Sequence, residues 1–154
     1  MNIIGDGGHA KVIRDLLLDF PYAAGTVIAV GNNFDRRREA QNITDPCEPL
    51  IHRSAVVSPS ARIGSGTVVM AGAIVQSGAI IGEHCIVNTG ATLDHDCVLE
   101  DFVHIAPGAH LCGHVKVGEG TLVGVGVGIA PMAVIPPWSL VKAARLDIEP
   151  LQNH

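Results

Sequence analysis

Residues 79–105 read AIIGEHCIVNTGATLDHDCVLEDFVHI, and an aliphatic residue recurs in this stretch at every sixth position. The same register runs from Val57 to Val141 without a break. Its fifteen members are Val57, Ile63, Val69, Val75, Ile81, Val87, Leu93, Leu99, Ile105, Leu111, Val117, Val123, Ile129, Ile135 and Val141. A helix requires a period of 3.6 and a single flat strand a period of 2, so this period predicts short strands joined by regular corners.

A second column lies two positions before each aliphatic residue, and twelve of its fifteen members are Ala, Thr, Cys or Ser. Residues two apart in a strand share a face, so both columns point inward. Three positions after the aliphatic residue, seven of fifteen are Gly, which suits turns that need a positive φ. We therefore expect a parallel β-solenoid, with about five coils if each coil holds three units.

The composition fits a narrow aliphatic core and excludes several classes of protein. Of the 154 residues 47% are apolar, 16% are charged and only 3% are aromatic. The chain is too apolar for intrinsic disorder and too poor in aromatics for stacking of single-stranded nucleic acid. Its net charge of -5 provides no basic surface for nucleic-acid phosphates. No nucleic-acid partner is expected.

The first fifty residues follow a different pattern. Residues 2–4 predict a strand, residues 5–10 a glycine-rich turn and residues 11–20 an amphipathic helix. A strand over 26–30 and a short helix over 34–40 follow. This order matches the loop of dinucleotide-binding domains, whose backbone N–H groups receive phosphate, although the usual acidic residue about twenty positions later is absent. A glycine-rich tight turn that binds no ligand is the alternative.

Two features of this segment have simple structural interpretations. Residues 36–38 are three consecutive arginines, which we expect on a solvated face, with attraction of an anionic ligand as the alternative. Phe20, Tyr22 and Phe34 are expected in the core of the small N-terminal domain.

The sequence predicts a cytoplasmic protein. The start, MNIIGDGGHAK, has no basic leader and is not expected to be a signal peptide. No stretch approaches the roughly 18 apolar residues of a membrane span. The four cysteines (Cys47, Cys85, Cys97 and Cys112) have no CxxC spacing and are expected to be buried thiols.

The chain resembles the NeuD/PglD family of bacterial sugar acetyltransferases in five segments. They are IIGDGGHAKVIRDLL (3–17), IAVGNN (28–33), LIHRSAVVSPSARIG (50–64), IVNTGATLDHDCVL (86–99) and FVHIAPGAHLCG (102–113). The resemblance implies a left-handed β-helix that holds CoA, a Rossmann-like domain that holds a sugar nucleotide, and a homotrimer with intersubunit active sites. It also implies acetyl transfer from acetyl-CoA to an amino sugar, a nucleotide-linked amino sugar or sialic acid.

The expected architecture is mainly β. We assign residues 1–50 to an abbreviated α/β, Rossmann-like, sugar-nucleotide-binding domain and residues 51–144 to a left-handed parallel β-helix acyltransferase domain. Residues 145–154 form a C-terminal tail, and residues 46–51 are interpreted as a link to the repeat. Both ends are shorter than is usual in the family.

The resemblance places the catalytic base at His95 and its orienting carboxylate at Asp96. Imidazole titrates near neutral pH and suits removal of a proton from an acceptor. An adjacent carboxylate orients the ring and raises its basicity. From the sequence alone, a solvated corner histidine is the alternative. We expect direct transfer in a ternary complex, because Cys97 belongs to the inward column and is a poor candidate for a covalent route.

The resemblance implies two binding groups and no metal. The positions matching CoA contacts are His104, Val125 and Ala143, with His104 beside the acetyl group. The positions matching sugar-nucleotide contacts are Gly7, Gly8, His9 and Gly31. For His104, an outward surface histidine is the alternative interpretation.

Two other functions stay open at this level. One is a non-catalytic trimeric β-helix module. The other is a metalloenzyme similar to the γ-class carbonic anhydrases, with His104, His110 and His114 as zinc ligands. His110 and His114 are four positions apart, where that family has five, and His104 and His110 are one repeat apart, on successive faces.

Overall fold

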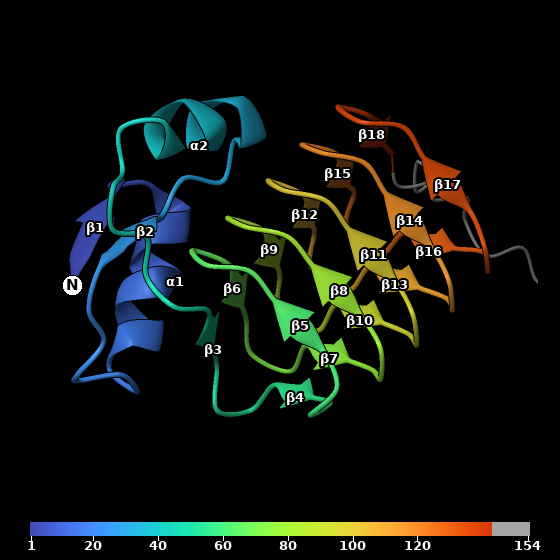
Figure 1. The fold of residues 1–154 in the computed structure, drawn as a ribbon, viewed down its shortest axis with the longest axis horizontal. Coiled ribbons are helices and arrows are strands. Elements are labelled where there is room, and N and C mark those ends of the chain that lie inside the picture. Colours follow the sequence, from blue (N-terminus) through green and yellow to red (C-terminus); the bar gives the residue numbers. More distant parts are fainter. Residues whose placement is uncertain (143–154) are drawn as a thin grey trace, which may run out of the picture.

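The computed structural model describes residues 1–142, which form an N-terminal α/β segment followed by a β-helix (Figure 1). The N-terminal segment contains β1 (Asn2–Ile4), α1 (Gly8–Leu17), β2 (Thr26–Ile28) and α2 (Asn33–Ala40). β1 and β2 pair in parallel. The predicted order of elements is confirmed, although α1 begins and ends three residues before the expected range 11–20. Ala143 and the predicted tail lie outside the described residues.

The β-helix consists of two-residue strands in three parallel sheets (Figure 1). The first sheet contains β3 (Leu50–Ile51), β6 (Val68–Val69), β9 (Ile86–Val87), β12 (His104–Ile105), β15 (Leu122–Val123) and β18 (Leu140–Val141). The second contains β4 (Val56–Val57), β7 (Ile74–Val75), β10 (Thr92–Leu93), β13 (His110–Leu111) and β16 (Gly128–Ile129). The third contains β5 (Arg62–Ile63), β8 (Ile80–Ile81), β11 (Val98–Leu99), β14 (Lys116–Val117) and β17 (Val134–Ile135). Three hexapeptide units therefore form each coil, and the predicted parallel solenoid of about five coils is confirmed.

The core of the β-helix is built from the two inward columns. Leu93, Leu99 and Ile105 are at most 1% exposed, and the small residues Ala91 and Cys97 between them are fully buried. Because successive coils stack at about 4.8 Å, aliphatic side chains fill the axis without leaving space for rings. Cys112 departs from the prediction of buried thiols: it follows an inward residue by one position and is exposed.

The β-helix starts one unit before the first predicted repeat. Leu50 and Ile51 were interpreted as part of a link, but they form β3 and pair with Val68 and Val69 of β6. Ile51 continues the aliphatic column and packs against the main core. The small-residue column is interrupted at this unit by Pro49, which hides the pattern in the sequence.

The corners repeat a left-handed backbone conformation at every sixth residue. The residues with positive φ are Gly66, Gly72, Gly78, His84, Gly90, Asp96, Phe102, Gly108, His114, Gly120, Gly126, Met132 and Trp138. Residues 18 apart stack in one corner. The Phe102 corner comprises Gly66, His84, Phe102, Gly120 and Trp138; the glycine corner comprises Gly72, Gly90, Gly108 and Gly126; the Asp96 corner comprises Gly78, Asp96, His114 and Met132. Non-glycine residues at positive φ are uncommon, and Asp and His are among the better tolerated.

The N-terminal segment packs on the outer face of the first sheet. Ala10 and Ile13 of α1 share a buried cluster with Val68 and Ile86, whose side chains point away from the β-helix axis. Figure 1 shows α1 and the β1–β2 pair beside the end of the β-helix where β3 and β6 lie. The segment is therefore attached to one side of the prism by a second apolar core.

Helix α2 docks on the Phe102 corner through hydrogen bonds to backbone oxygens of successive coils. The Arg36 guanidinium donates to the oxygens of His84 (2.8 Å) and Phe102 (2.7 Å). The Asn33 side-chain amide donates to the oxygen of Gly120 at 2.9 Å. Arg36 is only 1% exposed, so the expectation of a solvated arginine run is wrong for this residue.

The aromatic residues of the N-terminal segment do not form a shared core. Tyr22 is 96% exposed, and only Phe20 packs against the buried cluster. Phe34 instead stacks on Trp138 of the β-helix, with ring centroids 4.6 Å apart. The rings therefore join α2 to the last coils. Within residues 1–142, neither helix has the length and apolarity needed to cross a membrane.

Candidate active site

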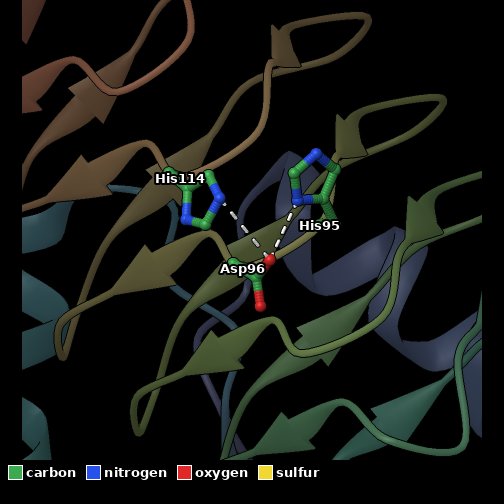
Figure 2. A group of neighbouring side chains, drawn as sticks. All are labelled: His95, Asp96 and His114. Atoms are coloured by element: carbon green, nitrogen blue, oxygen red, sulfur yellow. Dashed lines mark hydrogen bonds and ion pairs between the residues drawn. The ribbon is translucent and has the colours of Figure 1, made fainter.

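The predicted catalytic pair lies in the Asp96 corner, directly after β10 (Figure 2). The His95 Nδ1 and Asp96 Oδ2 atoms are 2.9 Å apart, a hydrogen-bond distance. The backbone N–H of His95 donates to Asp94 Oδ1 at 2.9 Å. The His95 and Asp96 side chains are each about half exposed. The pair is thus held on the outside of the prism, within reach of substrate.

Two glycines make room for this pair. A Cβ atom on Gly113 would lie 2.6 Å from the Cε1 and Nε2 atoms of His95, and one on Gly78 would collide with Asp96 Oδ1. Asp96 itself has a φ of 59°, a conformation that Asp adopts more readily than most residues. The His95 ring can therefore lie over Gly113 in the following coil, while the Asp96 carboxylate lies over Gly78 in the preceding coil.

The surroundings of His95 favour a general base. The hydrogen bond with Asp96 is the largest influence and raises the pKa of the imidazole. Desolvation, the next largest, lowers it, and the negative charges of Asp94 and Asp96 raise it further. In the neutral ring, Asp96 holds the proton on Nδ1, since a carboxylate can only accept it. Nε2 then carries a free lone pair that faces away from the carboxylate and can take a proton from an acceptor.

His114 is a third member of the corner that the sequence analysis did not connect with His95. It stands 18 residues after Asp96, in the same corner one coil later. Its Nε2 atom lies 3.8 Å from Asp96 Oδ2, too far for a hydrogen bond, and its ring packs edge-on against His95 with centroids 5.1 Å apart (Figure 2). The 18-residue spacing between Asp96 and His114 is the feature of the sequence that could have indicated this proximity.

The predicted sugar-nucleotide residues come together in one place. Gly7, Gly8, His9 and Gly31 line a surface pocket of about 350 Å³. Gly7 caps the N-terminus of α1 without a side-chain hydrogen bond, and the first turn has no acidic residue. Free N–H groups at a helix N-terminus suit a phosphate. Burial lowers the pKa of His9 to about 4, with a smaller effect of Arg36, so this imidazole is neutral at pH 7.

His104 lies on the first sheet, against the N-terminal segment. Its Nε2 atom is 3.1 Å from the Asn88 amide nitrogen, and Asn88 Oδ1 accepts the backbone N–H of Thr89. This orientation of the amide makes His104 Nε2 an acceptor. Burial lowers the pKa of His104 to about 4, helped by the positive charge of Arg36. Val125, the other predicted CoA contact within residues 1–142, is exposed.

One chain does not bring the catalytic and substrate groups together. His95 lies at the corner between the second and third sheets, whereas the pocket of Gly7, Gly8 and Gly31 lies outside the first sheet. The two groups occupy different sides of a three-sided prism. One chain on its own therefore does not unite the predicted base with the predicted sugar-nucleotide pocket.

The alternative sites receive no support from the geometry of one chain. His104 lies on the first sheet, His110 on the second and His114 in the Asp96 corner, so the three imidazoles do not converge. Cys97 is fully buried, its Sγ atom donates to the oxygen of Cys112, and burial raises the pKa of its thiol. Cys97 is therefore unsuited to nucleophilic attack.

Comparison of the sequence with known proteins finds both a matching family model and a curated relative. A family model described as bacterial transferase hexapeptide (six repeats) matches residues 49–95. UDP-N-acetylbacillosamine N-acetyltransferase of Bacillus subtilis (strain 168) is 43% identical, with 45% of this chain and 50% of that protein covered. The chain therefore spans about half the length of this curated relative.

Two solved structures are similar over most of the chain. The acetyltransferase domain of PglB from Neisseria gonorrhoeae, in complex with acetyl coenzyme A, is 35% identical with a TM-score of 0.85. The match covers 90% of this chain and 85% of that one. PerB from Caulobacter crescentus, in complex with CoA and GDP-perosamine, is 34% identical with a TM-score of 0.82, over 90% and 83% of the two chains. The similarity thus includes the N-terminal segment as well as the β-helix.

Proposed function

This chain belongs to the hexapeptide-repeat family of bacterial sugar acetyltransferases, and on that basis we propose that it transfers the acetyl group of acetyl-CoA to an amino sugar carried on a nucleotide. The observation that carries the proposal is the His95–Asp96 pair, whose 2.9 Å hydrogen bond leaves Nε2 free at an exposed corner. We also propose that the reaction takes place in the cytoplasm.

The proposed chemistry is direct transfer with His95 as the general base. The sugar amine attacks the thioester carbonyl, an N–C bond forms, and His95 Nε2 takes the proton that the amine loses. The C–S bond then breaks, and the proton passes to the departing CoA sulfur. Asp96 holds the ring and stabilises the imidazolium that forms between the two steps.

The binding roles of the other residues are part of the same proposal. Acetyl-CoA is assigned to His104 and Val125, together with Ala143, which lies outside the described residues. The neutral His104 suits a position beside an uncharged acetyl group. The nucleotide sugar is assigned to the pocket of Gly7, Gly8, His9 and Gly31, where the N-terminus of α1 is free to receive phosphate.

We further propose a homotrimer in which the Asp96 corner of one chain faces the first sheet and the N-terminal segment of its neighbour. This arrangement would unite the two groups that a single chain keeps on different sides of the prism. Sedimentation equilibrium tests it: a trimer is expected, and a monomer at concentrations that support full activity would contradict the intersubunit site.

Acetyl transfer is tested by release of free CoA thiol with a panel of acceptors. The panel contains UDP- and GDP-linked amino sugars, the corresponding free amino sugars, and sialic acid. Turnover is expected with at least one nucleotide-linked amino sugar and with much lower efficiency for its free sugar. Thiol release no faster than acetyl-CoA hydrolysis with every acceptor, from folded protein, would contradict the proposal and favour the non-catalytic module.

The Asp96→Asn variant is expected to lower kcat about 10-fold, part of the 10²–10⁴ that a general base contributes. Because Asp96 raises the pKa of His95, its loss is also expected to move the acidic limb of the kcat/KM profile to lower pH. Asp94 and His114 remain near the His95 ring in this variant. If Asp96 had a purely structural role, its replacement would reduce the rate but leave the acidic limb of the profile at the same pH. The measurement is the pH profile of both proteins.

A further inference from the structure

The Asp96 corner holds more than a catalytic pair. Three side chains there each present one ligand-type atom, and these atoms all lie within 4.8 Å of one another. The residues are His95, Asp96 and His114, and His95 Nδ1 and His114 Nε2 lie 2.9 Å and 3.8 Å from the same atom, Asp96 Oδ2. Figure 2 shows both imidazole nitrogens directed at the same carboxylate oxygen. All three residues are exposed.

The size of this triangle suits a small metal ion. The separations of 2.9 Å and 3.8 Å lie on either side of the roughly 3.3–3.6 Å between two ligands of a tetrahedral zinc ion with bonds of about 2.0–2.2 Å. Small rotations of the exposed side chains close the difference. Two imidazoles and one carboxylate form a donor set that late first-row transition metals accept, with further positions left for water.

The backbone of two successive coils arranges these donors. Asp96 and His114 occupy the same corner position in successive coils, both with a left-handed φ near 60°. Gly113 leaves the volume over which the His95 ring lies. The Asp94 carboxylate, which accepts the backbone N–H of His95, adds negative charge beside the triangle. An arriving cation thus meets two carboxylates and two imidazoles.

We propose that His95, Asp96 and His114 bind a late first-row divalent transition-metal ion such as Zn²⁺, and that the bound ion inhibits acetyl transfer reversibly. The inhibition rests on the function proposed above, but metal binding does not. The site is distinct from the His104, His110 and His114 set considered from the sequence, because two of its three ligands differ.

The geometry explains why the ion would inhibit. In the neutral active ring the proton is on Nδ1, next to Asp96, and the lone pair is on Nε2. A metal ion on Nδ1 needs the lone pair there, so the proton moves to Nε2, the atom that has to receive the proton of the acceptor. His95 then has no basic nitrogen available, and Asp96 is occupied by the ion. No net proton is lost or gained in this exchange of tautomers.

Metal binding is tested without any activity measurement. Purified protein is freed of metal and titrated with Zn²⁺ in competition with a chromophoric chelator, and with Co²⁺ while its visible absorption is recorded. The wild type is expected to bind one ion per chain. His114→Asn is expected to bind at least about 10-fold more weakly, since loss even of a group supporting a ligand costs 10–100-fold. Asn also tolerates the left-handed conformation at this corner.

His110→Asn is the matched control. His110 is an exposed histidine on the neighbouring second sheet, and its Nδ1 is paired with Thr92 Oγ1 at 2.9 Å. This variant is expected to bind Zn²⁺ as the wild type does. Equal affinity of the wild type and His114→Asn, or absence of a Co²⁺ spectrum in the wild type, would overturn the metal site.

Inhibition is measured with the same proteins. For each protein, the measured quantity is the Zn²⁺ concentration that halves its own zinc-free rate. In His114→Asn this concentration is expected to rise by the same factor as the dissociation constant for Zn²⁺. EDTA is expected to restore activity. Zinc binding that leaves the wild-type rate unchanged would overturn the inhibitory role. If no acceptor is acetylated while zinc still binds the three residues, the proposed function fails and the metal site stands.

Discussion

His95→Ala is expected to lower kcat for acetyl transfer by about 10²–10⁴-fold, the usual contribution of a general base. The variant removes the nitrogen that receives the acceptor's proton. Without it, this proton has to be transferred to water, which is a weaker base. The KM for acetyl-CoA is expected to stay unchanged. His95 is assigned no contact with acetyl-CoA before the reaction begins, so its loss should affect the transition state and not the binding of acetyl-CoA. The measurement is steady-state thiol release over a range of acetyl-CoA concentrations.

The control for this variant is another histidine of the same β-helix. His52 follows β3, and its Nδ1 contacts only the Ser54 backbone N–H and hydroxyl among the recorded hydrogen bonds of residues 1–142. His52→Ala is expected to keep the wild-type rate. Unchanged sedimentation of His95→Ala would show that the fold and assembly persist. A kcat for His95→Ala within about threefold of the wild type would contradict general-base catalysis by this residue.

The β-helix was predictable because its information is local and repeated. Each unit places an aliphatic residue and a small residue on one face, and the pattern recurs in fifteen consecutive units. The unit at Ile51 was missed because Pro49 occupies the small-residue position, where only pairing with β6 reveals the strand. The docking of the N-terminal segment was not predictable, since the outward Val68 and Ile86 look like ordinary members of exposed strands.

The geometry of the candidate site was predictable only in the parts that are adjacent in sequence. His95 and Asp96 are neighbours, and a family motif marks them. To predict that His114 lies beside this pair, one has to know that residues 18 apart share a corner, and that Asp96 and His114 therefore occupy the corner that holds His95. The separation of His95 from the Gly7–Gly8 pocket depends on which sheet α1 covers, and periodicity carries no information on that choice.

Arg36 is the clearest case of a residue whose role follows from tertiary structure. Its guanidinium donates to the oxygens of Val30, Gly31, His84 and Phe102 and to the Asn33 side chain. No carboxylate within residues 1–142 forms an ion pair with it, and burial lowers its pKa to about 10, which leaves it charged at pH 7. One cation thus joins the end of β2, helix α2 and two coils of the β-helix.

Arg36→Met is expected to lower the stability of α2 docking by about 2–4 kcal/mol, because it leaves several buried acceptors without partners. The loss should be local, since each coil of a repeat structure is stabilised mainly by its neighbours. Hydrogen exchange is expected to accelerate in α2 and around Gly31 while β9 to β14 keep their protection. Under the proposed function, KM for the nucleotide sugar rises, because Gly31 lines its pocket.

Arg38→Ala provides the matched comparison within the same helix. The Arg38 side chain is 66% exposed and, among residues 1–142, pairs only with Asp35 and Glu39 on α2 itself. Such surface pairs contribute at most about 1 kcal/mol, so exchange in α2 should change little. Equal effects of the two substitutions would mean that helix charge, and not the buried network, determines docking. Faster exchange throughout the β-helix in Arg36→Met would contradict the independence of the coils from the N-terminal segment.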